Sequence, residues 1–484
     1  MRWLFLLLLA CGPAVAQTMP APVLDLNGSV ATATGGTTAR TLAAMAADCL
    51  NPISFGADPT GAALSTTAIQ AAITAAQGSG NGGGSAKRVC VTAGNYSSGP
   101  LTVPRSVEII GDGEKTTNIQ LVSGSTAPLF TVATAYDAGN YYAGGSPPAV
   151  VTFRGLRLWT ASNTDAPGLN LGHGIALRTA STNPVYAKVV IDHVIFDRFP
   201  GNGLDGNGFG SNGFVVLSNS YFIASQNGLS ANSNYDWRIS TCDFSKAVID
   251  NIVISGAAGF NFYGVNSYSA GRTNLYIFSS GAETGRSTFV SGAIDSAQQH
   301  GVVYDQRGTT SPFTFIGTHF SSNGQSAAGT YNDIEINGGA NNDLRLDNVM
   351  FSAPHSFVAG NTSLYNVGMV AGTQTVAIDN VWLEAPITDA LQYGAQYYGS
   401  YYQSGAAATT AYLRNNRIDS NIVNSTTGYS VNGANVVGPR VTGWGTPSGG
   451  SRSALNGSSA TLAQTSAGLA QLIADLTAHG LIGP

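Results

Sequence analysis

The sequence predicts an all-β protein, a single-stranded right-handed parallel β-helix in which short strands wind repeatedly around one long core. The main observation is a repeat that begins near residue 154. Its unit is an apolar-x-apolar strand, then two or three small polar residues, then a large apolar residue. Steps of 26 residues (196 to 222) and 32 residues (351 to 383) between unit ends are typical of solenoids. The units end at Phe196, Phe222, Phe244, Tyr268, Phe320, Phe351 and Leu383.

A second strand pattern lies between these units. It alternates apolar and polar residues, as expected of a strand with one face in a core and the other toward solvent. No amphipathic helix of about 10–15 residues separates the strands, which argues against a doubly wound α/β sheet. We expect about eight to ten coils, because a solenoid adds one coil per repeat. The second pattern starts at His173, Asp250, Asn274, His300, Asn332 and Tyr365.

Polar residues recur where these second strands begin. Such residues can hydrogen-bond the backbone at the corners of a solenoid. We therefore interpret the column as a stacked structural ladder and not as a set of catalytic groups. Its members are His173, Asn202, Asn227, Asp250, His300 and Asn332.

The N-terminal part, Asn51 to Gly113, has a different order of elements. It predicts a strand at residues 53–55, a small-residue helix at 65–76, and strands at 88–91, 100–103 and 107–110. With its Phe-Gly-Ala-Asp, Ala-Gly-Asn-Tyr and Gly-Asp-Gly turns, this order resembles the start of the pectate-lyase-like family of right-handed parallel β-helices, of the rhamnogalacturonase and epimerase type. The resemblance covers about 60 residues and implies a helix that caps the solenoid and protects its sheet edge. The family's acidic turn is reduced to Asp58, and Thr92 stands where it usually has proline.

The composition excludes several partners. Of 484 residues only 10% are charged, against about 25% in typical domains, and 61 are glycine. A net charge of -5 provides no broad attraction for nucleic acid or acidic lipid. No apolar run reaches the 18 or so residues that a membrane span needs, so we expect no membrane insertion.

Residues 1–16 have the pattern of a signal peptide, with Arg2, an apolar run and Ala14-Val15-Ala16 before the cleavage site. This predicts a secreted or periplasmic protein. A lipid anchor at Cys11 is the less favoured alternative. Residues 17–48 are expected to form a flexible leader, and residues 49–402 the capped β-helix.

Three cysteines remain after cleavage of the predicted signal peptide. Cys49 and Cys90 both lie in the N-terminal part, and in an oxidising compartment we expect a disulfide between them. The alternative is a pair of unpaired buried thiols. Cys242 belongs to a strand pattern and is predicted to be a small core residue.

Residues 403–484 differ from the solenoid. Leu462, Leu469 and Leu476 recur every seven residues on one face of a predicted helix, which His479-Gly480 would end. The preceding residues 431–445 and this helix resemble the C-termini of phage and prophage tail proteins. In that setting such helices assemble trimers, so the resemblance implies a homotrimer. The alternative is a helix folded back on the end of the solenoid.

Carboxylates are scarce, which narrows the search for a catalytic pair. If the strands from His300 and Asn332 are neighbours, Val302, Tyr304, Ile334 and Ile336 point inward, and Asp305 and Glu335 point outward. The two acids would then be about 8 Å apart, from about 4.8 Å between strands and 6.6 Å along them. That separation is typical of an inverting glycosidase. Glu283 is a further catalytic candidate. The alternative is that these are solvated surface acids.

The candidate substrate-binding residues are an aromatic and cationic set. Exposed aromatic rings suit stacking on sugars, although they are also typical of subunit interfaces. We predict no metal site; Ca²⁺ would be needed only by a lyase. The candidates are Tyr276, Arg286, Arg307, His319 and Trp382.

Together these features predict an exported carbohydrate-active protein that binds and cleaves an extracellular polysaccharide. A glycoside hydrolase is favoured over a lyase. No other cofactor is expected. The alternative is a non-catalytic polysaccharide-binding or structural β-helix of the tailspike type.

Overall fold

The structure is a computed structural model, and it describes the solenoid between its longer loops. The predicted signal peptide, Cys11, most of the leader, Glu283 and Arg307 lie outside the described residues. The described ranges are 49–76, 88–103, 106–133, 149–161, 172–178, 187–208, 213–232, 235–255, 259–279, 286–306, 313–327, 330–338, 342–352 and 461–478, with short strands elsewhere.

A cap covers the N-terminal end of the solenoid. Helix α2 (Thr66–Ala76) buries one face of small and branched residues, including Ile69 and Ile73. This matches the helix predicted for residues 65–76. The strand predicted at residues 53–55 is wrong: Pro52–Phe55 form a 3₁₀ helix, η1. Asn51 caps η1 through a side-chain bond from the Ile53 N–H, and Gly56, at φ 94°, closes it in the left-handed region.

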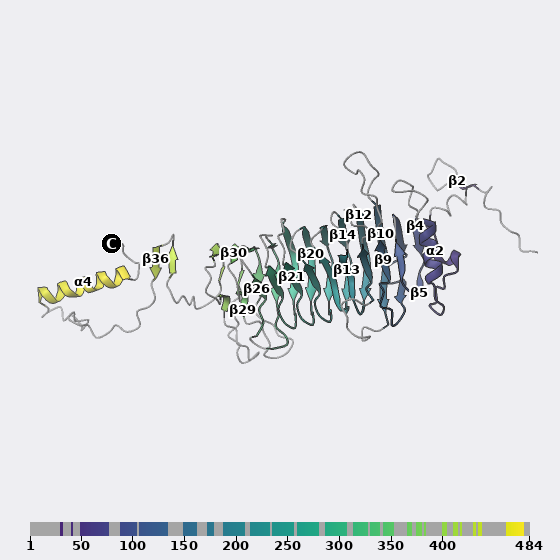
Figure 1. Ribbon diagram of the computed structural model, residues 1–484. Helices are drawn as coiled ribbons and strands as arrows, with labels where there is room; N and C mark the ends of the chain where they lie inside the picture. Colours follow the sequence, from purple (N-terminus) through teal and green to yellow (C-terminus); the bar gives the residue numbers. More distant parts are fainter. Residues whose placement is uncertain are drawn as a thin grey trace, which may run out of the picture. The chain divides into compact units, whose positions relative to one another are not determined.

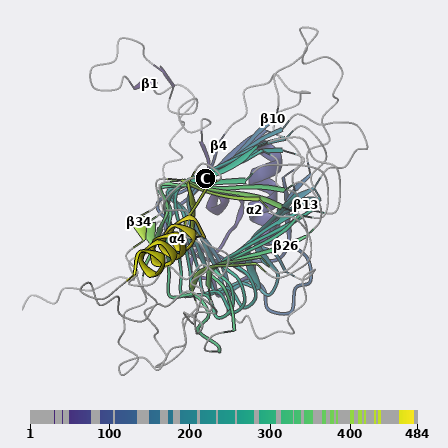
Figure 2. The same cartoon turned by 90° about the vertical axis from the view of Figure 1, so that its left-hand side faces the viewer.

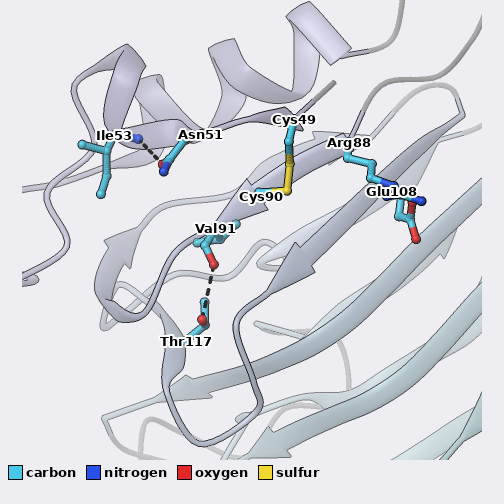
Figure 3. Close-up of a disulfide and its surroundings, with 8 residues drawn as sticks. All are labelled: Cys49, Asn51, Ile53, Arg88, Cys90, Val91, Glu108 and Thr117. Carbon is cyan, nitrogen blue, oxygen red and sulfur yellow. Dashed lines mark hydrogen bonds and ion pairs between the residues drawn. A yellow bond between two sulfur atoms is a disulfide. The ribbon is translucent and has the colours of Figure 1, made fainter. Parts of the chain in front are cut away.

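The predicted disulfide joins Cys49 to Cys90, with the two Cα atoms 5.7 Å apart. Cys49 lies in β3 (Cys49–Leu50), which pairs in parallel with β4 (Arg88–Val91). Figure 3 shows the bond between these strands, beside the ion pair of Arg88 with Glu108. The bond closes a loop of 41 residues, for which a stabilisation of a few kcal/mol, about 3–4, is typical.

Three faces of parallel strands form the solenoid (Figure 1). Face 1 contains β4, β7 (Val107–Gly111), β10 (Ala149–Thr160), β12 (Ala187–Asp197), β14 (Gly213–Ser218), β17 (Tyr235–Ser240), β20 (Phe260–Tyr268), β22 (Ser287–Asp295), β24 (Phe313–Ile316), β27 (Asn342–Asp347), β30 (Gln374–Asp379) and β33 (Thr410–Arg414).

Face 2 follows face 1 around a corner. The long strands β10, β12, β20 and β22 pass from one face to the other. Face 2 also contains β5 (Gly94–Ser98), β8 (Thr117–Leu121), β15 (Tyr221–Ile223), β18 (Asp243–Ser245), β25 (His319–Ser321), β28 (Met350–Phe351), β31 (Trp382–Leu383) and β34 (Arg417–Ile418).

In the part of the chain that the structure describes, face 3 is a parallel sheet of eleven strands, slightly more than the eight to ten coils expected. In Figure 2, β13 and β26 of this face overlie each other, while β10 lies on another side. The strands are β6 (Leu101–Val103), β9 (Phe130–Ala133), β11 (Ile175–Arg178), β13 (Asn202–Gly208), β16 (Asn227–Asn232), β19 (Ile252–Ser255), β21 (Leu275–Ser279), β23 (Val302–Gln306), β26 (Ile334–Gly338), β29 (Tyr365–Met369) and β32 (Gly399–Gln403).

The small polar residues of the repeat form the corner between faces 1 and 2. Asn219 and Asn348 have positive φ values of 49° and 53° there, and Gly317 has 60°. One residue in the left-handed region redirects the chain, and Asn and Gly adopt that region at low cost. This explains why two or three small residues separate each apolar strand from its terminal aromatic residue.

Those terminal aromatic residues stack inside the core. The ring centroids of Phe196 and Phe222 are 4.5 Å apart, and those of Phe222 and Phe244 are 4.4 Å apart. Tyr268 is an exception among them, because Ser267 pairs with Phe244 and Tyr268 is 37% exposed. In this coil the small residue Ser267 therefore occupies the core position, and the larger Tyr268 lies outside the core. Cys242 is buried as predicted, and burial raises the pKa of its thiol to about 12.

The remaining residues, Asp419–Pro484, form a separate compact unit. It contains the hairpin of β35 (Tyr429–Val431) and β36 (Ala434–Val437) and helix α4 (Leu462–Ala478). Leu462, Leu469 and Leu472 are exposed on α4, Leu462 by 87%. At the leader, β1 (Val30–Ala31) pairs with β2 (Arg40–Thr41). None of the helices among the described residues has the length and apolar content of a membrane span.

Candidate functional site

Asp305 and Glu335 lie on neighbouring strands of face 3. In β23 and β26, Val303 pairs with Glu335 and Asp305 pairs with Asn337, which confirms the predicted register. Their neighbours Val302, Tyr304, Ile334 and Ile336 are fully buried, as predicted. The two acids are therefore diagonal neighbours, about 8 Å apart by sheet geometry.

The interpretation of Asp305 as a solvated surface acid is wrong. Asp305 lies on the outer side of β23, yet only 6% of it is exposed. The side chain of Glu335 is 18% exposed. Both carboxyl groups are thus largely shielded from water, and electrostatic interactions are stronger in such an environment than in bulk solvent.

Glu335 is held by two amide N–H groups and lies against the His300 ring. His300 Nε2 lies 3.0 Å from Glu335 Oε2, and Asn337 Nδ2 donates to Oε1 at 2.8 Å. Asn332 Nδ2 donates to Oε2 at 3.4 Å. Each of these groups is a donor, so Glu335 is arranged as an acceptor with both oxygens engaged.

The backbone determines which nitrogen of His300 has the proton. The Asn332 N–H donates to His300 Nδ1 at 3.0 Å, so the proton of the neutral ring is on Nε2, facing Glu335. Burial lowers the pKa of His300, while the negative charge of Glu335 opposes this effect. The Tyr331 ring packs nearly perpendicular to the imidazole, with the two ring centroids 5.1 Å apart.

Two aromatic side chains flank this cluster on β21. Tyr276 pairs with Val303, and Phe278 pairs with Asp305. Their rings are nearly parallel, at 5° and with centroids 6.5 Å apart. Arg272 stacks on Tyr276 and binds Asp250 through two N–H groups. A partly exposed aromatic pair therefore lies directly beside the acids.

The same arrangement occurs a second time, at the other end of face 3. We name the two copies the His300 module and the His173 module. The His300 module contains His300, Asp305, Asn332, Glu335 and Asn337; the His173 module contains His173, Arg178, Asn202, Asp205 and Asn207. Both have the sequence His-Gly, and in the next coil Asn-x-apolar-acid-x-Asn.

The hydrogen bonds of the His173 module repeat those of the His300 module. The Asn202 N–H donates to His173 Nδ1 at 2.9 Å, and His173 Nε2 lies 3.6 Å from Asp205 Oδ2. Asn207 and Asn202 donate to Asp205 Oδ1 at 2.9 and 3.2 Å. Burial again lowers the pKa of the histidine.

The two modules differ five residues after the histidine. There the His173 module has Arg178, which forms an ion pair with Asp205. The His300 module has Asp305 at that position. They also differ on the preceding strand, because Thr131 and Ala133 of β9 pair with β11 where Tyr276 and Phe278 pair with β23.

The polar column at the start of the face 3 strands is a ladder, as predicted. Asn227 donates to Asn202 at 2.9 Å, and the Asp250 N–H donates to Asn227 at 3.2 Å. The purely structural interpretation of His173 and His300 is incomplete, because both also contact a carboxylate. The repeated His-Gly and Asn-x-apolar-acid-x-Asn pattern was the signal in the sequence that could have revealed this.

Three predicted binding residues lie elsewhere. His319 and Trp382 belong to β25 and β31 of face 2, and His319 contacts Ser352. Arg286 is exposed and directly precedes β22 of face 1. These residues are on other faces than Asp305 and Glu335, because the predicted strand columns do not share one surface. Tyr276 is the predicted binding residue that the structure places beside the acids.

Among the described residues no group of three or more His, Cys, Asp or Glu could hold a metal ion. The described side chains of face 3 instead offer carboxyl groups, a neutral imidazole and aromatic rings, which are suited to acid–base chemistry on a sugar.

No family model and no curated protein matches the chain. Among solved structures it is similar to the enzymatically active domain of tailspike protein 2 of bacteriophage CBA120. The TM-score is 0.53 at 15% identity, over 73% of this chain and 50% of that one. It is also similar to the A-module of mannuronan C-5 epimerase AlgE6 of Azotobacter vinelandii, with a TM-score of 0.51 at 15% identity, over 76% of this chain and 99% of that one.

A third similar structure is full-length tailspike protein 2 of an Escherichia coli O157:H7 bacteriophage, with a TM-score of 0.50 at 14% identity, over 73% of this chain and 45% of that one. The chain thus spans about half the length of the tailspike chains it matches. These likenesses confirm the predicted right-handed parallel β-helix and the resemblance of its fold to that of tail proteins.

Proposed function

We propose that the protein is an exported glycoside hydrolase that cleaves an extracellular polysaccharide at the His300 module. The observation that supports this most is the exchange at one position between two otherwise matching modules. Arg178 neutralises Asp205 in one module, whereas Asp305 adds a second carboxyl group beside Glu335 in the other. An ion pair compensates the charge of a buried carboxylate, whereas glycoside hydrolysis requires a pair of carboxyl groups.

The surroundings of the two acids suggest their roles. Glu335, which accepts two amide N–H bonds and lies 3.0 Å from His300 Nε2, would act as the base that removes a proton from water. Asp305 would act as the acid that protonates the leaving glycosidic oxygen. A separation of about 8 Å leaves space for the water, so we expect inversion at the anomeric carbon. Tyr276 and Phe278 would stack on a sugar ring beside Asp305.

A panel of polysaccharides tests this proposal. New reducing ends would identify a hydrolase, and unsaturated products that absorb ultraviolet light would identify a lyase. We expect Asp305→Asn and Glu335→Gln to abolish the release of reducing ends, and the matched control Asp205→Asn in the His173 module to retain it. Full activity of both first variants would refute the assignment.

The second candidate function is polysaccharide binding without cleavage by a tailspike-like homotrimer. The observation that favours it is the row of exposed leucines on α4, spaced by seven residues between Leu462 and Leu469. Leucines at this spacing pack between helices in coiled coils. Light scattering would measure the mass of the full chain and of a chain ending before Leu462. A monomeric full chain at micromolar concentration would refute the trimer.

Export to an oxidising compartment is part of the proposal. It is supported by the N-terminal pattern of residues 1–16 and by the Cys49–Cys90 disulfide, since such bonds persist outside the cytosol. Mass spectrometry of the protein secreted by its host cell would test it. We expect a chain that starts at Gln17 and contains one disulfide.

A further inference from the structure

We propose that His300 is a positioning residue, which orients Glu335 for proton removal without touching the substrate. This rests on the proposed hydrolase function and extends it to a residue outside the acid pair. The contact of His300 Nε2 with Glu335 Oε2, at 3.0 Å, is the feature from which the inference starts.

The first step is the fixed tautomer. The Asn332 N–H, two residues before β26, donates to His300 Nδ1, so the proton of the neutral ring is on Nε2, which lies 3.0 Å from Glu335 Oε2. If the proton were on Nδ1 instead, two N–H groups would face each other at Asn332, and if the ring turned over, a C–H group would replace Nδ1 there. The imidazole is therefore held in one orientation by the backbone, and it transmits that orientation to the carboxylate.

The second step is burial. The side chain of His300 is 11% exposed, and Tyr331 packs against its ring, whereas Glu335 is more exposed, at 18%. Burial also lowers the pKa of His300, which keeps the ring neutral and Nε2 a donor at neutral pH. A buried neutral donor acts on the reaction through Glu335 and not through direct proton transfer to the sugar.

The third step is the contrast with the His173 module. Asp205 has a guanidinium partner, Arg178, so it stays in place without its histidine, which is 3.6 Å away. Among the described residues the other side chains bonded to Glu335 are the neutral amides of Asn332 and Asn337. Glu335 therefore depends on its histidine more than Asp205 does.

Two substitutions of His300 separate its two contacts. The oxygen of His300→Asn can replace Nδ1 as the acceptor for Asn332, but the shorter side chain leaves Glu335 without its donor. The amide nitrogen of His300→Gln can replace Nε2 and donate to Glu335. The matched control is His173→Asn in the other module. Thermal unfolding of all three variants shows whether each is folded.

We expect His300→Asn to lower kcat about 10- to 100-fold with little change in KM, less than the 10²- to 10⁴-fold typical for loss of an acid or base itself. His300→Gln should recover part of that loss, and His173→Asn should retain the wild-type kcat. If the histidines were merely structural, both His300→Asn and His173→Asn would lower the fraction of folded enzyme. His300→Gln would then not restore kcat.

Several results would overturn the inference. A wild-type kcat in His300→Asn, or an equal loss in His173→Asn, refutes it while leaving the hydrolase intact. Absence of cleavage by the wild type refutes the proposed function and this inference together. If His300→Asn is unfolded, nitrogen NMR of the wild type decides, because the inference requires a neutral His300 with its proton on Nε2, and a proton on Nδ1 contradicts it.

Discussion

The His173 and His300 modules share the histidine tautomer, the pair of asparagine amides and the strand pairing at the acid, where Ala176 pairs with Asp205 and Val303 with Glu335. Two residues further on, the pairing shifts by one residue in the His173 module, so that Arg178 pairs with Gly208. They differ in charge: Arg178 neutralises Asp205, whereas Asp305 joins Glu335. They differ also in the neighbouring strand, where Thr131 and Ala133 correspond to Tyr276 and Phe278. The same hydrogen-bonded cluster at a corner of the solenoid thus becomes a candidate reaction site when an aspartate replaces the arginine and two aromatic rings lie on the preceding strand.

The largest effect is expected from converting one module into the other. Asp305→Arg gives the His300 module the charge pattern of the His173 module, so Glu335 gains an ion pair. We expect kcat to fall about 10³-fold or more, as for loss of a general acid, because the acid is removed. The melting temperature should change little, since the arginine at the corresponding position of the His173 module forms an ion pair with Asp205.

Reducing-end assays and thermal unfolding measure the two quantities. A variant that keeps more than a tenth of the wild-type rate would show that Asp305 is not the acid. A large fall in melting temperature would show that the two modules are not structurally equivalent. Asp305→Asn is the control that removes the charge without adding a cation.

The converse change should affect stability and not activity. Arg178→Ala leaves Asp205 buried without its cation. We expect the free energy of unfolding to fall by about 1–3 kcal/mol, below the roughly 3–5 kcal/mol typical of a fully buried pair, because Arg178 is partly exposed. Urea denaturation measures this loss. Loss of kcat without loss of stability would mean that the His173 module takes part in the reaction.

The sequence predicted the fold because the solenoid repeats its signals. Strand alternation places Val302 and Tyr304 inward, so the diagonal relation of Asp305 and Glu335 followed from aligning two coils. The helix at 66–76 was predictable because its signals are local in the sequence. The Cys49–Cys90 bond was predictable because the chain has few cysteines to pair.

Other features depended on information that no single coil contains. Residues 53–55 are apolar and suggest a strand, yet the Asn51 cap and Gly56 favour a 3₁₀ turn. The contact of His300 with Glu335 spans 35 residues of sequence (300 to 335). It also depends on which nitrogen of the imidazole accepts the hydrogen bond from the backbone N–H of Asn332. Alternation alone does not reveal such a contact. It also does not reveal that Asp305, on the outer side of its strand, is only 6% exposed.

Acid should affect both modules alike. Histidine binds a proton below pH about 6.5 when unfolded, whereas burial lowers the pKa of His173 and His300 in the folded state. Their contribution to stability is therefore complete above about pH 6.5 and is lost as the pH falls toward the folded pKa values. The slope is at most about 1.4 kcal/mol per pH unit for each histidine.

Urea denaturation between pH 7 and pH 5 tests this symmetry. The double variant His173→Asn/His300→Asn should show a flatter dependence than the wild type, and each single variant should lie between them. If one single variant accounts for the whole change, the two imidazoles differ in environment. The modules would then differ at their histidines as well as at Arg178 and Asp305.

The smallest effect is expected from the aromatic pair, which only the His300 module possesses. Tyr276→Ala and Phe278→Ala each remove a ring that could stack on a sugar, an interaction worth about 0.5–1.5 kcal/mol, or roughly 2- to 12-fold in KM. Thr131→Ala, at the position of the His173 module that corresponds to Tyr276, should leave KM unchanged. If all three variants bind alike, the rings serve packing alone, and the charge exchange between Arg178 and Asp305 is the whole functional difference between the modules.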